Sequence, residues 1–295
     1  MKMTMKRVET RFVAGLVGWL ALAVPSVHAA TLAGDLTTAG STATVNGAIY
    51  NQTSFNSTGS GVIDSFVRMG VTTSPEQAYN TTVDGVFDNG NDDTHNHAVA
   101  LTLTAPPIVD ISGTFYRELL LDINEPSAHG GADSLLSLDE IQILLSSIPN
   151  QSVTTFSSGI LNLTNSALVY RLDTASVDNY IKLNAGLNSG SGSGDVFVNI
   201  PNSLFNTVLT ANPTYTYLYV YSRFGEQTGP PSLINDSGFE EWAYRLGVTP
   251  PCAATDTCNP PPPVIPEPAS LLLFSSGLLG AFGVNGARQG RRRSR

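Results

Sequence analysis

The chain has 295 residues, of which 41% are hydrophobic and 13% are charged, and its formal net charge at pH 7 is −9. This negative charge disfavours binding to nucleic acids and to anionic membrane surfaces, which are negatively charged themselves. We therefore expect no nucleic-acid partner. The length allows one large domain in addition to targeting segments at the ends.

The N-terminus has the three-part pattern of a secretory signal peptide. An apolar stretch from residue 12 to 24 follows a basic region. Small residues then occupy positions 27 and 29, which are the positions that a signal peptidase reads. We predict cleavage after Ala29 and exclude residues 1–29 from the fold. The basic residues of this segment are Lys2, Lys6, Arg7 and Arg11.

Residues 30–248 have the pattern of an all-β ectodomain. Segments rich in β-branched and aromatic residues alternate with clusters of Gly, Asn, Asp, Ser and Pro. Many short strands with polar turns are typical of a β-sandwich or a jelly-roll-like fold. The expected strands are 43–50, 61–69, 97–103, 116–122, 140–145, 167–172, 195–200 and 214–221. Short helices are expected at 176–187 and 202–208, where apolar residues fall at helical spacing.

A row of tyrosines marks the segment 214–221. On a strand, Tyr215, Tyr217, Tyr219 and Tyr221 point to one face, and Leu218 and Val220 to the other. Such a row is usually a half-buried sheet face, since its hydroxyls can reach water. A sugar-stacking platform, formed by this row or by Trp242, is the alternative.

Oxygen-rich side chains gather between residues 122 and 140. Calcium needs six to eight oxygen ligands, which loops between strands can supply. The candidate ligands are Asp122, Asn124, Asp133 and Asp139. The alternative is that these residues are turn formers. A second acidic loop runs from Asp84 into His95-Asn-His97, where a transition-metal site and a polar hairpin loop are both compatible with the sequence.

The ectodomain carries none of the usual catalytic motifs. The sequence lacks a nucleophile elbow, a zinc-protease helix motif and a phosphate-binding loop. Adjacent carboxylates occur, among them Asp139-Glu140 and Glu240-Glu241. Adjacent strand residues point to opposite sides, so neither pair provides the two facing acids of a glycosidase. We expect a non-enzymatic protein, with a polysaccharide-acting hydrolase as the alternative.

A proline-rich linker, residues 249–263, follows the ectodomain. It contains Cys252 and Cys258, which are the two cysteines of the chain. In an oxidising compartment outside the cytoplasm this pair is expected to form a small disulfide loop. Consecutive prolines favour an extended, semi-rigid spacer.

The last segment, residues 264–295, has three parts. Pro266, Glu267 and Pro268 come first, and an uncharged apolar run follows from residue 269 to 284. The run is slightly shorter than the roughly 20 residues that span a bilayer as a helix. An arginine cluster then favours retention on the cytoplasmic side, which leaves the ectodomain outside. The cluster consists of Arg288, Arg291, Arg292, Arg293 and Arg295.

This tail closely resembles the PEP-CTERM sorting signal of Gram-negative bacteria. The resemblance implies a transient anchor in the inner membrane, recognition by an exosortase, cleavage near Pro-Glu-Pro, and delivery to the cell surface or the medium. Such proteins are typical of bacteria that make exopolysaccharide and biofilm. Phrases such as YRELLLDINEP and NDSGFEEWAYRL resemble PEP-CTERM ectodomains of uncharacterised type, and this resemblance implies no activity.

The ectodomain is more acidic than the whole chain. The signal segment contributes +3 and the tail +4 to the total of −9, so the stretch between them carries −16. Such a domain attracts cations, calcium among them, although acidity also simply keeps exported proteins soluble. The sequence thus favours a surface or matrix protein associated with exopolysaccharide. A calcium-dependent adhesin is a further alternative.

Overall fold

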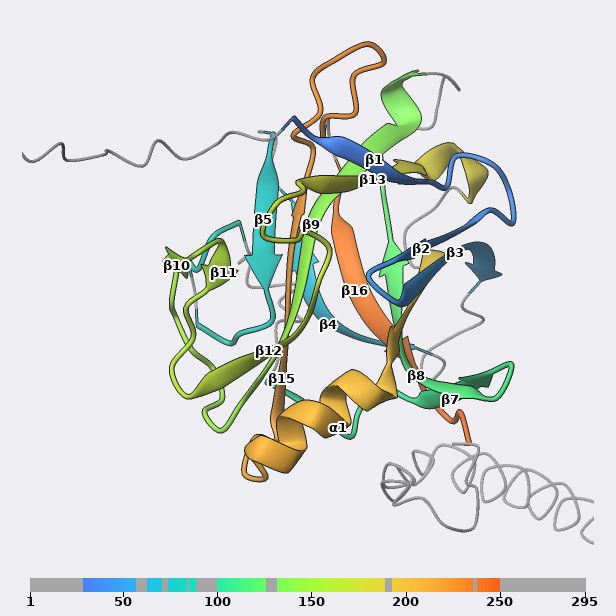
Figure 1. The fold of residues 1–295 in the computed structure, drawn as a ribbon. Coiled ribbons are helices and arrows are strands. Elements are labelled where there is room, and N and C mark those ends of the chain that lie inside the picture. The colour runs from blue at the N-terminus through green and yellow to red at the C-terminus, as the bar shows by residue number, and fades with distance from the viewer. Residues whose placement is uncertain are drawn as a thin grey trace, which may run out of the picture.

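The structure is a computed structural model that describes residues 29–56, 63–70, 74–83, 85–88, 100–125, 132–188, 193–235 and 238–249. The predicted signal segment up to residue 28, the two linker cysteines, both candidate metal-binding histidines and the sorting segment lie outside these residues. Within them the chain forms mainly β-strands with one α-helix, which confirms the all-β prediction (Figure 1).

The first sheet, called sheet A, has seven strands. Its strand order is β1 (Thr31–Asp35), β13 (Asn179–Asn184), β9 (Leu135–Ser146), β15 (Tyr217–Phe224) and β5 (Glu76–Tyr79). Two further strands extend it, since β12 (Ser166–Arg171) pairs with β9 and β6 (Leu101–Thr102) pairs with β15. The β1–β13 pair is parallel.

The second sheet, sheet B, also has seven strands. Its order is β2 (Thr42–Val45), β3 (Ala48–Asn56), β14 (Ser193–Pro201), β8 (Thr114–Asp122), β16 (Glu240–Arg245) and β4 (Ile63–Met69), with β7 (Ile108–Ile111) paired to β8. Outside both sheets are the hairpin of β10 (Phe156–Ser157) and β11 (Ile160–Leu161), the 3-10 turns Ala132–Ser134 and Ala185–Leu187, and α1 (Asn202–Ala211).

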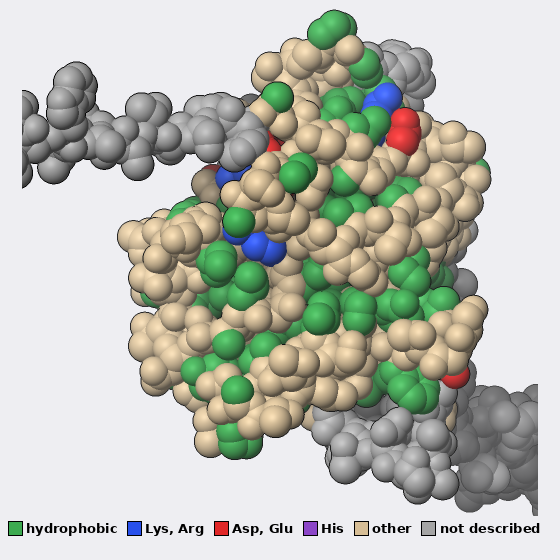
Figure 2. Space-filling model, in the orientation of Figure 1, with side chains coloured by type: hydrophobic (Ala, Val, Ile, Leu, Met, Phe, Trp, Pro, Cys, Tyr) green, Lys and Arg blue, Asp and Glu red, His purple; other side chains and the backbone are tan. Residues whose placement is uncertain are grey.

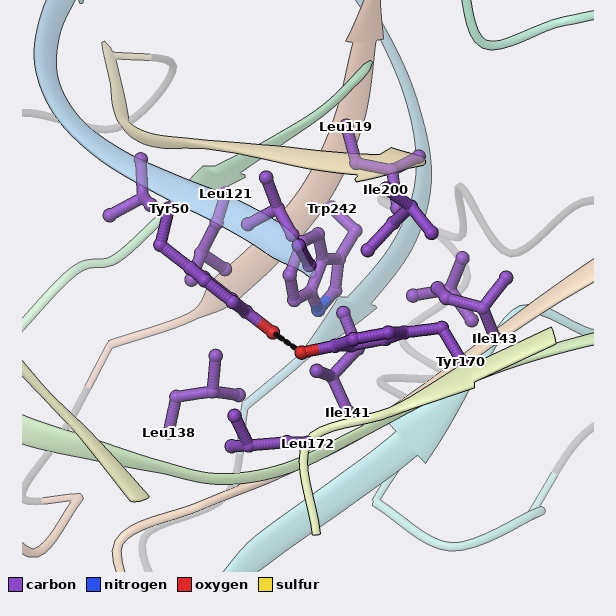
Figure 3. Packing of buried hydrophobic residues seen from close by; sticks show 14 of the residues in the cluster. Tyr50, Leu119, Leu121, Leu138, Ile141, Ile143, Tyr170, Leu172, Ile200 and Trp242 are labelled. Carbon is purple, nitrogen blue, oxygen red and sulfur yellow. Dashed lines mark hydrogen bonds between the residues drawn. The ribbon is translucent and has the colours of Figure 1, made fainter. Parts of the chain in front are cut away.

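The two sheets share one hydrophobic core. Ile141 of β9 and Tyr170 of β12 in sheet A meet Tyr50 of β3 and Trp242 of β16 in sheet B within it (Figure 3). Its polar atoms are paired, because the hydroxyls of Tyr50 and Tyr170 lie 2.8 Å apart and the Trp242 indole donates to the Ser222 hydroxyl at 2.9 Å. Pairing removes most of the desolvation penalty that burying these groups would carry.

A second, smaller cluster covers the outer face of sheet A. It joins Tyr79, Tyr219 and Tyr221 to Leu144 and to the β10–β11 region. Its hydroxyls are hydrogen-bonded, since Tyr79 donates to the carbonyl of Gln151 at 2.8 Å and Tyr221 to the Gln77 side chain at 2.8 Å. The strand β15 is therefore buried on both faces. Within β15 the alternation of tyrosines with Leu218 and Val220 is confirmed, but the tyrosine face is a second core, and Tyr215 lies before the strand and packs against the main core.

The segment 43–50, expected as one strand, is a hairpin. Strand β2 ends at Val45 and β3 begins at Ala48. The turn residues Asn46 and Gly47 have φ of 50° and 86°, and a type I′ hairpin turn needs positive φ at both. The same positive-φ pairing occurs at Ser112-Gly113 and Ser158-Gly159, between β7 and β8 and between β10 and β11.

The helix expected at 176–187 is wrong. Its central part is β13, in which Asn179, Ile181 and Leu183 are buried and alternate with half-buried residues, and only a 3-10 turn, Ala185–Leu187, follows. A period of two fits a strand that pairs with β9 on one side and β1 on the other. The second expected helix is confirmed as α1, which continues three residues beyond 208.

The other strand predictions largely hold. Strands β4, β8, β9, β12, β14 and β15 cover or overlap the segments predicted for them, and the described part of 97–103 contains only the short β6. Figure 1 shows that the start of β1 and the loop 225–235 lie at one end of the domain. The segment that follows β16, with which the described chain stops, lies at the opposite end.

Candidate functional site

The candidate site is an open depression at the end of the domain where β1 begins. Four separate chain segments line it, and the polar side chains among them come from three of these segments. The lining of the depression includes Ala30, Ser74, Asp178, Glu226, Gln227 and Asn235. Because carboxylates, amides and a hydroxyl dominate this set, the depression is suited to a ligand rich in hydrogen-bonding groups.

Asp139 holds one wall of the depression from beneath. Its Oδ2 accepts hydrogen bonds from the Ser137 hydroxyl and the Glu226 backbone N–H, both at 2.8 Å, and its Oδ1 accepts from Gln227 Nε2 at 2.8 Å. Burial raises the pKa of Asp139, and these three hydrogen bonds oppose that rise. Asp139 was predicted as a calcium ligand. In the structure its oxygens bind protein donors and position the loop that follows β15.

Ser74 ties two other segments of the depression together. Its hydroxyl donates to the carbonyl of Gly225 at 2.5 Å and accepts from the backbone N–H of Asn235 at 3.2 Å. Gly225 has a φ of +82°, and a Cβ there would lie 2.3 Å from the Ser74 hydroxyl. The close approach therefore requires glycine at position 225.

The Asn235 carboxamide is the most unusual group in the wall. The residue is only 3% exposed, yet neither its oxygen nor its nitrogen has a hydrogen-bond partner among the described residues. A buried amide without a partner is rare in native proteins. Both atoms are buried, so the amide is an unsatisfied polar group inside the wall, with one acceptor and two donor hydrogens unused.

Negative charge dominates the surroundings of Glu226. Burial raises the pKa of Glu226, and the carboxylates of Asp139, Asp178 and Asp173 act in the same direction. Arg223 opposes them, through an ion pair with Glu226 at 3.0 Å. With more carboxylates than cations, this end of the domain favours a cationic or hydrogen-bond-donating ligand.

The remaining predicted calcium ligands lie elsewhere. Asp122 and Asn124 are neighbours at the end of β8, where Asn124 Nδ2 lies 3.4 Å from Asp122 Oδ1 and donates to the Phe239 carbonyl at 3.1 Å. Asp133 is exposed in a 3-10 turn. Among the described residues no group of three or more His, Cys, Asp or Glu side chains could hold a metal ion. Calcium binding stays a prediction.

Two carboxyl groups near β8, Asp195 and Glu240, are buried, which the sequence analysis did not predict. Burial raises the pKa of Asp195 on β14 to about 9, and the nearby Asp122 adds to this effect. Burial also raises the pKa of Glu240, next to Glu76 of the opposite sheet. The sequence holds no signal for either pairing, because the partners come from distant strands.

The rings suggested as a sugar-stacking platform are all buried or half-buried, with Tyr215 and Tyr217 the half-buried ones. Trp242 and Tyr221 are 0% exposed and Tyr219 is 2% exposed, so no ring among them is available for stacking on a sugar. The face in Figure 2 is mostly uncharged, with hydrophobic side chains spread over it. In the described part of the chain the exposed large hydrophobics are Leu32, Phe156, Val177 and Phe239.

The comparisons with known proteins identify the tail. Residues 264–289 match the family model of the PEP-CTERM protein-sorting motif. The chain therefore carries this motif, as the sequence indicated, and it is an exported protein that an exosortase system sorts. No curated protein and no solved structure matches the chain. No helix of the described residues is long and apolar enough to cross a membrane.

Proposed function

We propose that the chain is a surface or matrix protein whose β-sandwich domain associates with exopolysaccharide without cleaving it. The observation that carries this proposal is the sorting motif at residues 264–289, which follows a large domain of two β-sheets. Signals of this kind are typical of bacteria that make exopolysaccharide. The exosortase is then a transient partner, and the polymer is the lasting one.

The depression supports this proposal with suitable chemistry. Sugar hydroxyls both donate and accept hydrogen bonds, and Gln227 and Glu226 line the depression with groups of both kinds, while the unsatisfied amide of Asn235 lies buried in its wall. The acidity of the domain favours a neutral polymer or one with amino groups. An acidic polymer would need a bridging cation, so the proposed calcium role of Asp122, Asn124, Asp133 and Asp139 belongs to the same test.

The test is co-sedimentation of the exported protein, purified from its host, with the host's own exopolysaccharide. The experiment is run with calcium and with EDTA, and the chain length of the polymer is measured afterwards. We expect binding without shortening of the polymer. Absence of binding under both conditions would leave a surface protein with no polymer partner and would contradict the proposal.

The variant Asn235→Ala locates the binding site. Removing an amide that has no protein partner should leave the stability of the fold unchanged or slightly higher. The apparent affinity for the polymer should fall about five- to tenfold, the equivalent of one or two hydrogen bonds. The matched control is Asn162→Ala, at an exposed position. Equal loss in both variants would argue against the depression as the site.

The sorting step has its own test. Replacing Pro266, Glu267 and Pro268 by alanine should prevent processing, so that the protein accumulates in the inner-membrane fraction. Western blotting of membrane, surface and medium fractions measures this. Unchanged delivery of the variant to the surface would show that the motif is not what the sorting enzyme reads.

A hydrolase is the second candidate. Asp178 and Glu226 come from different elements and line the same depression, as a glycosidase requires of its two acids. If the polymer is shortened during co-sedimentation and Glu226→Gln abolishes the shortening, the hydrolase hypothesis is favoured. Binding that is lost in EDTA and restored by calcium would instead favour a calcium-dependent adhesin.

A further inference from the structure

The first residue after the predicted signal cleavage lies in the depression. Ala30 lines it together with Asp178 and Glu226. The next residue is fixed, because the Thr31 backbone N–H donates to the Asp178 carbonyl at 2.7 Å and β1 then runs parallel to β13. The pairing of β1 therefore determines where position 30 lies relative to these carboxylates.

Signal cleavage changes the chemistry at that position. Hydrolysis of the Ala29–Ala30 peptide bond consumes one water and leaves a carboxylate on Ala29 and an amine on Ala30. An α-amino group has a pKa of about 7.7–8.0, so it takes up a proton and carries a positive charge at neutral pH. Before cleavage this nitrogen is a neutral amide. Export thus creates a cation in a region with an excess of carboxylates.

A second observation indicates that the depression is built for a ligand. The Asn235 carboxamide is almost fully buried in its wall and lacks a partner among the described residues. Its oxygen is an acceptor for an N–H group, and an ammonium has three N–H donors. The amide nitrogen remains available for a sugar hydroxyl, so the two uses of Asn235 do not exclude each other.

We propose that the depression binds the chain's own new N-terminus, so that the α-ammonium of Ala30 pairs with Asp178 and Glu226 once the signal peptide has been removed. The interaction exists only in the exported, processed protein. It relieves repulsion among the carboxylates of Asp139, Asp173, Asp178 and Glu226, which Arg223 alone offsets at Glu226. The proposal rests on export and cleavage after Ala29, and it is independent of polymer binding.

The pH dependence follows from the sign of the interaction. Carboxylates next to an ammonium favour its charged form and raise its pKa above that in the unfolded chain. The stabilisation is therefore fully present below the unfolded pKa, and it is lost as the pH rises through the folded pKa. The titratable and charged groups involved are Asp139, Asp173, Asp178, Glu226 and Arg223.

The composition of the chain makes the test simple. After signal removal, Lys182 is the one lysine left, so an amine-directed reagent has only two targets. The exported protein is treated with acetic anhydride over a range of pH, and acetylation at Ala30 and at Lys182 is measured by mass spectrometry. The same protein in guanidinium chloride provides the unfolded reference, and the N-terminal peptide verifies the cleavage site.

We expect acetylation of the Ala30 amine at pH 8 to be at least about threefold slower in the folded protein than in the unfolded protein. Glu226→Gln and Asp178→Asn should each make it faster. The charge-matched controls Glu241→Gln, on sheet B, and Asp133→Asn should not change it. Equal rates in folded, unfolded and variant proteins would overturn the proposal, as would a mature N-terminus at another residue.

The folded-against-unfolded comparison needs no variant, so it decides the question even if a substitution impairs folding. Its outcome is also separate from that of the polymer experiment. Loss of polymer binding with a protected Ala30 amine would overturn the proposed function alone. Polymer binding with an unprotected amine would overturn only this inference.

Discussion

Glu140 on sheet A and Asp195 on sheet B are both 2% exposed, but the two carboxyl groups accept different numbers of hydrogen bonds. Glu140 accepts hydrogen bonds from the backbone N–H groups of Ile141 and Leu172 and from Arg171, at 3.0–3.1 Å. Asp195 accepts one, from the Ile123 N–H at 2.8 Å, and its other oxygen has no partner among the described residues.

The pKa values follow this difference. Burial raises the pKa of Glu140 from 4.5 to about 7, with the nearby Asp173 adding to the rise and Arg171 opposing it. Burial raises the pKa of Asp195 much further, from 3.8 to about 9. Equal burial thus has unequal consequences, because donors to the ionised form offset the loss of water at one site and hardly at the other.

Removing the better-paired carboxyl should have the largest effect. Glu140→Ala removes the 3.1 Å ion pair of the half-buried Arg171 and one acceptor of the Ile141 and Leu172 N–H groups, so we expect a loss of about 3 kcal/mol in the free energy of unfolding. Urea denaturation at pH 8 measures it. The control Glu241→Ala, half-buried on sheet B, should lose less than about 1 kcal/mol. Similar losses of stability in the two variants would show that the hydrogen bonds and the ion pair of Glu140 do not stabilise the fold.

Neutralising the poorly paired carboxyl should stabilise the protein, and more so at higher pH. Between the unfolded pKa of Asp195 and its folded value of about 9, the native state binds more protons than the unfolded state. Stability therefore falls as the pH rises through this window. Asp195→Asn removes that fall, so it should gain at least about 1 kcal/mol relative to the native protein between pH 5 and pH 8.

Denaturation curves at the two pH values provide the measurement for Asp195→Asn. A gain that is the same at pH 5 and pH 8 would mean that the carboxyl is not protonated in the folded protein. The same two denaturation curves for Glu140→Gln provide a comparison. The pKa of Glu140 in the folded protein is about 7, so its contribution to the fall in stability is complete near pH 7.

Removing the neutral hydroxyl of Tyr79 should have the smallest effect on the free energy of unfolding. The Tyr79 hydroxyl donates to the carbonyls of Gln151 at 2.8 Å and Val153 at 3.1 Å. Tyr79→Phe leaves these loop carbonyls without that donor, so we expect a loss of about 1 kcal/mol. Tyr217→Phe, on a half-buried tyrosine of the same sheet, should change the stability by less than about 0.5 kcal/mol. A larger change at Tyr217 would contradict this assignment.

Local patterns predicted most of the strands, and they failed where the signal was short or ambiguous. The Asn46-Gly47 dipeptide is a hairpin signal that was available in the sequence, and overlooking it merged two strands into one. In the segment 176–187, apolar residues at helical spacing competed with an alternation that begins only at Asn179. The segment forms a strand because it pairs with β1 and β9, and such tertiary contacts often outweigh local propensity.

The candidate site could not be read from the sequence in the same way. Its walls come from the start of β1, the loop before β5, the loop before β13 and the segment after β15. No spacing along the chain connects these segments. Asp139 shows the limit most clearly, since its oxygen-rich neighbourhood suggested a metal ligand, whereas the fold uses it to hold the Glu226-Gln227 loop. The tail, whose pattern is continuous, was recognised fully.

The two ends of the described chain lie at opposite ends of the domain. The segment that follows β16 leaves the domain at the end away from the depression (Figure 1). A domain tethered through its C-terminal side would therefore turn the depression outward, towards whatever surrounds the cell. In that case the end of the domain that carries the predicted mature N-terminus would be the described part farthest from the tether.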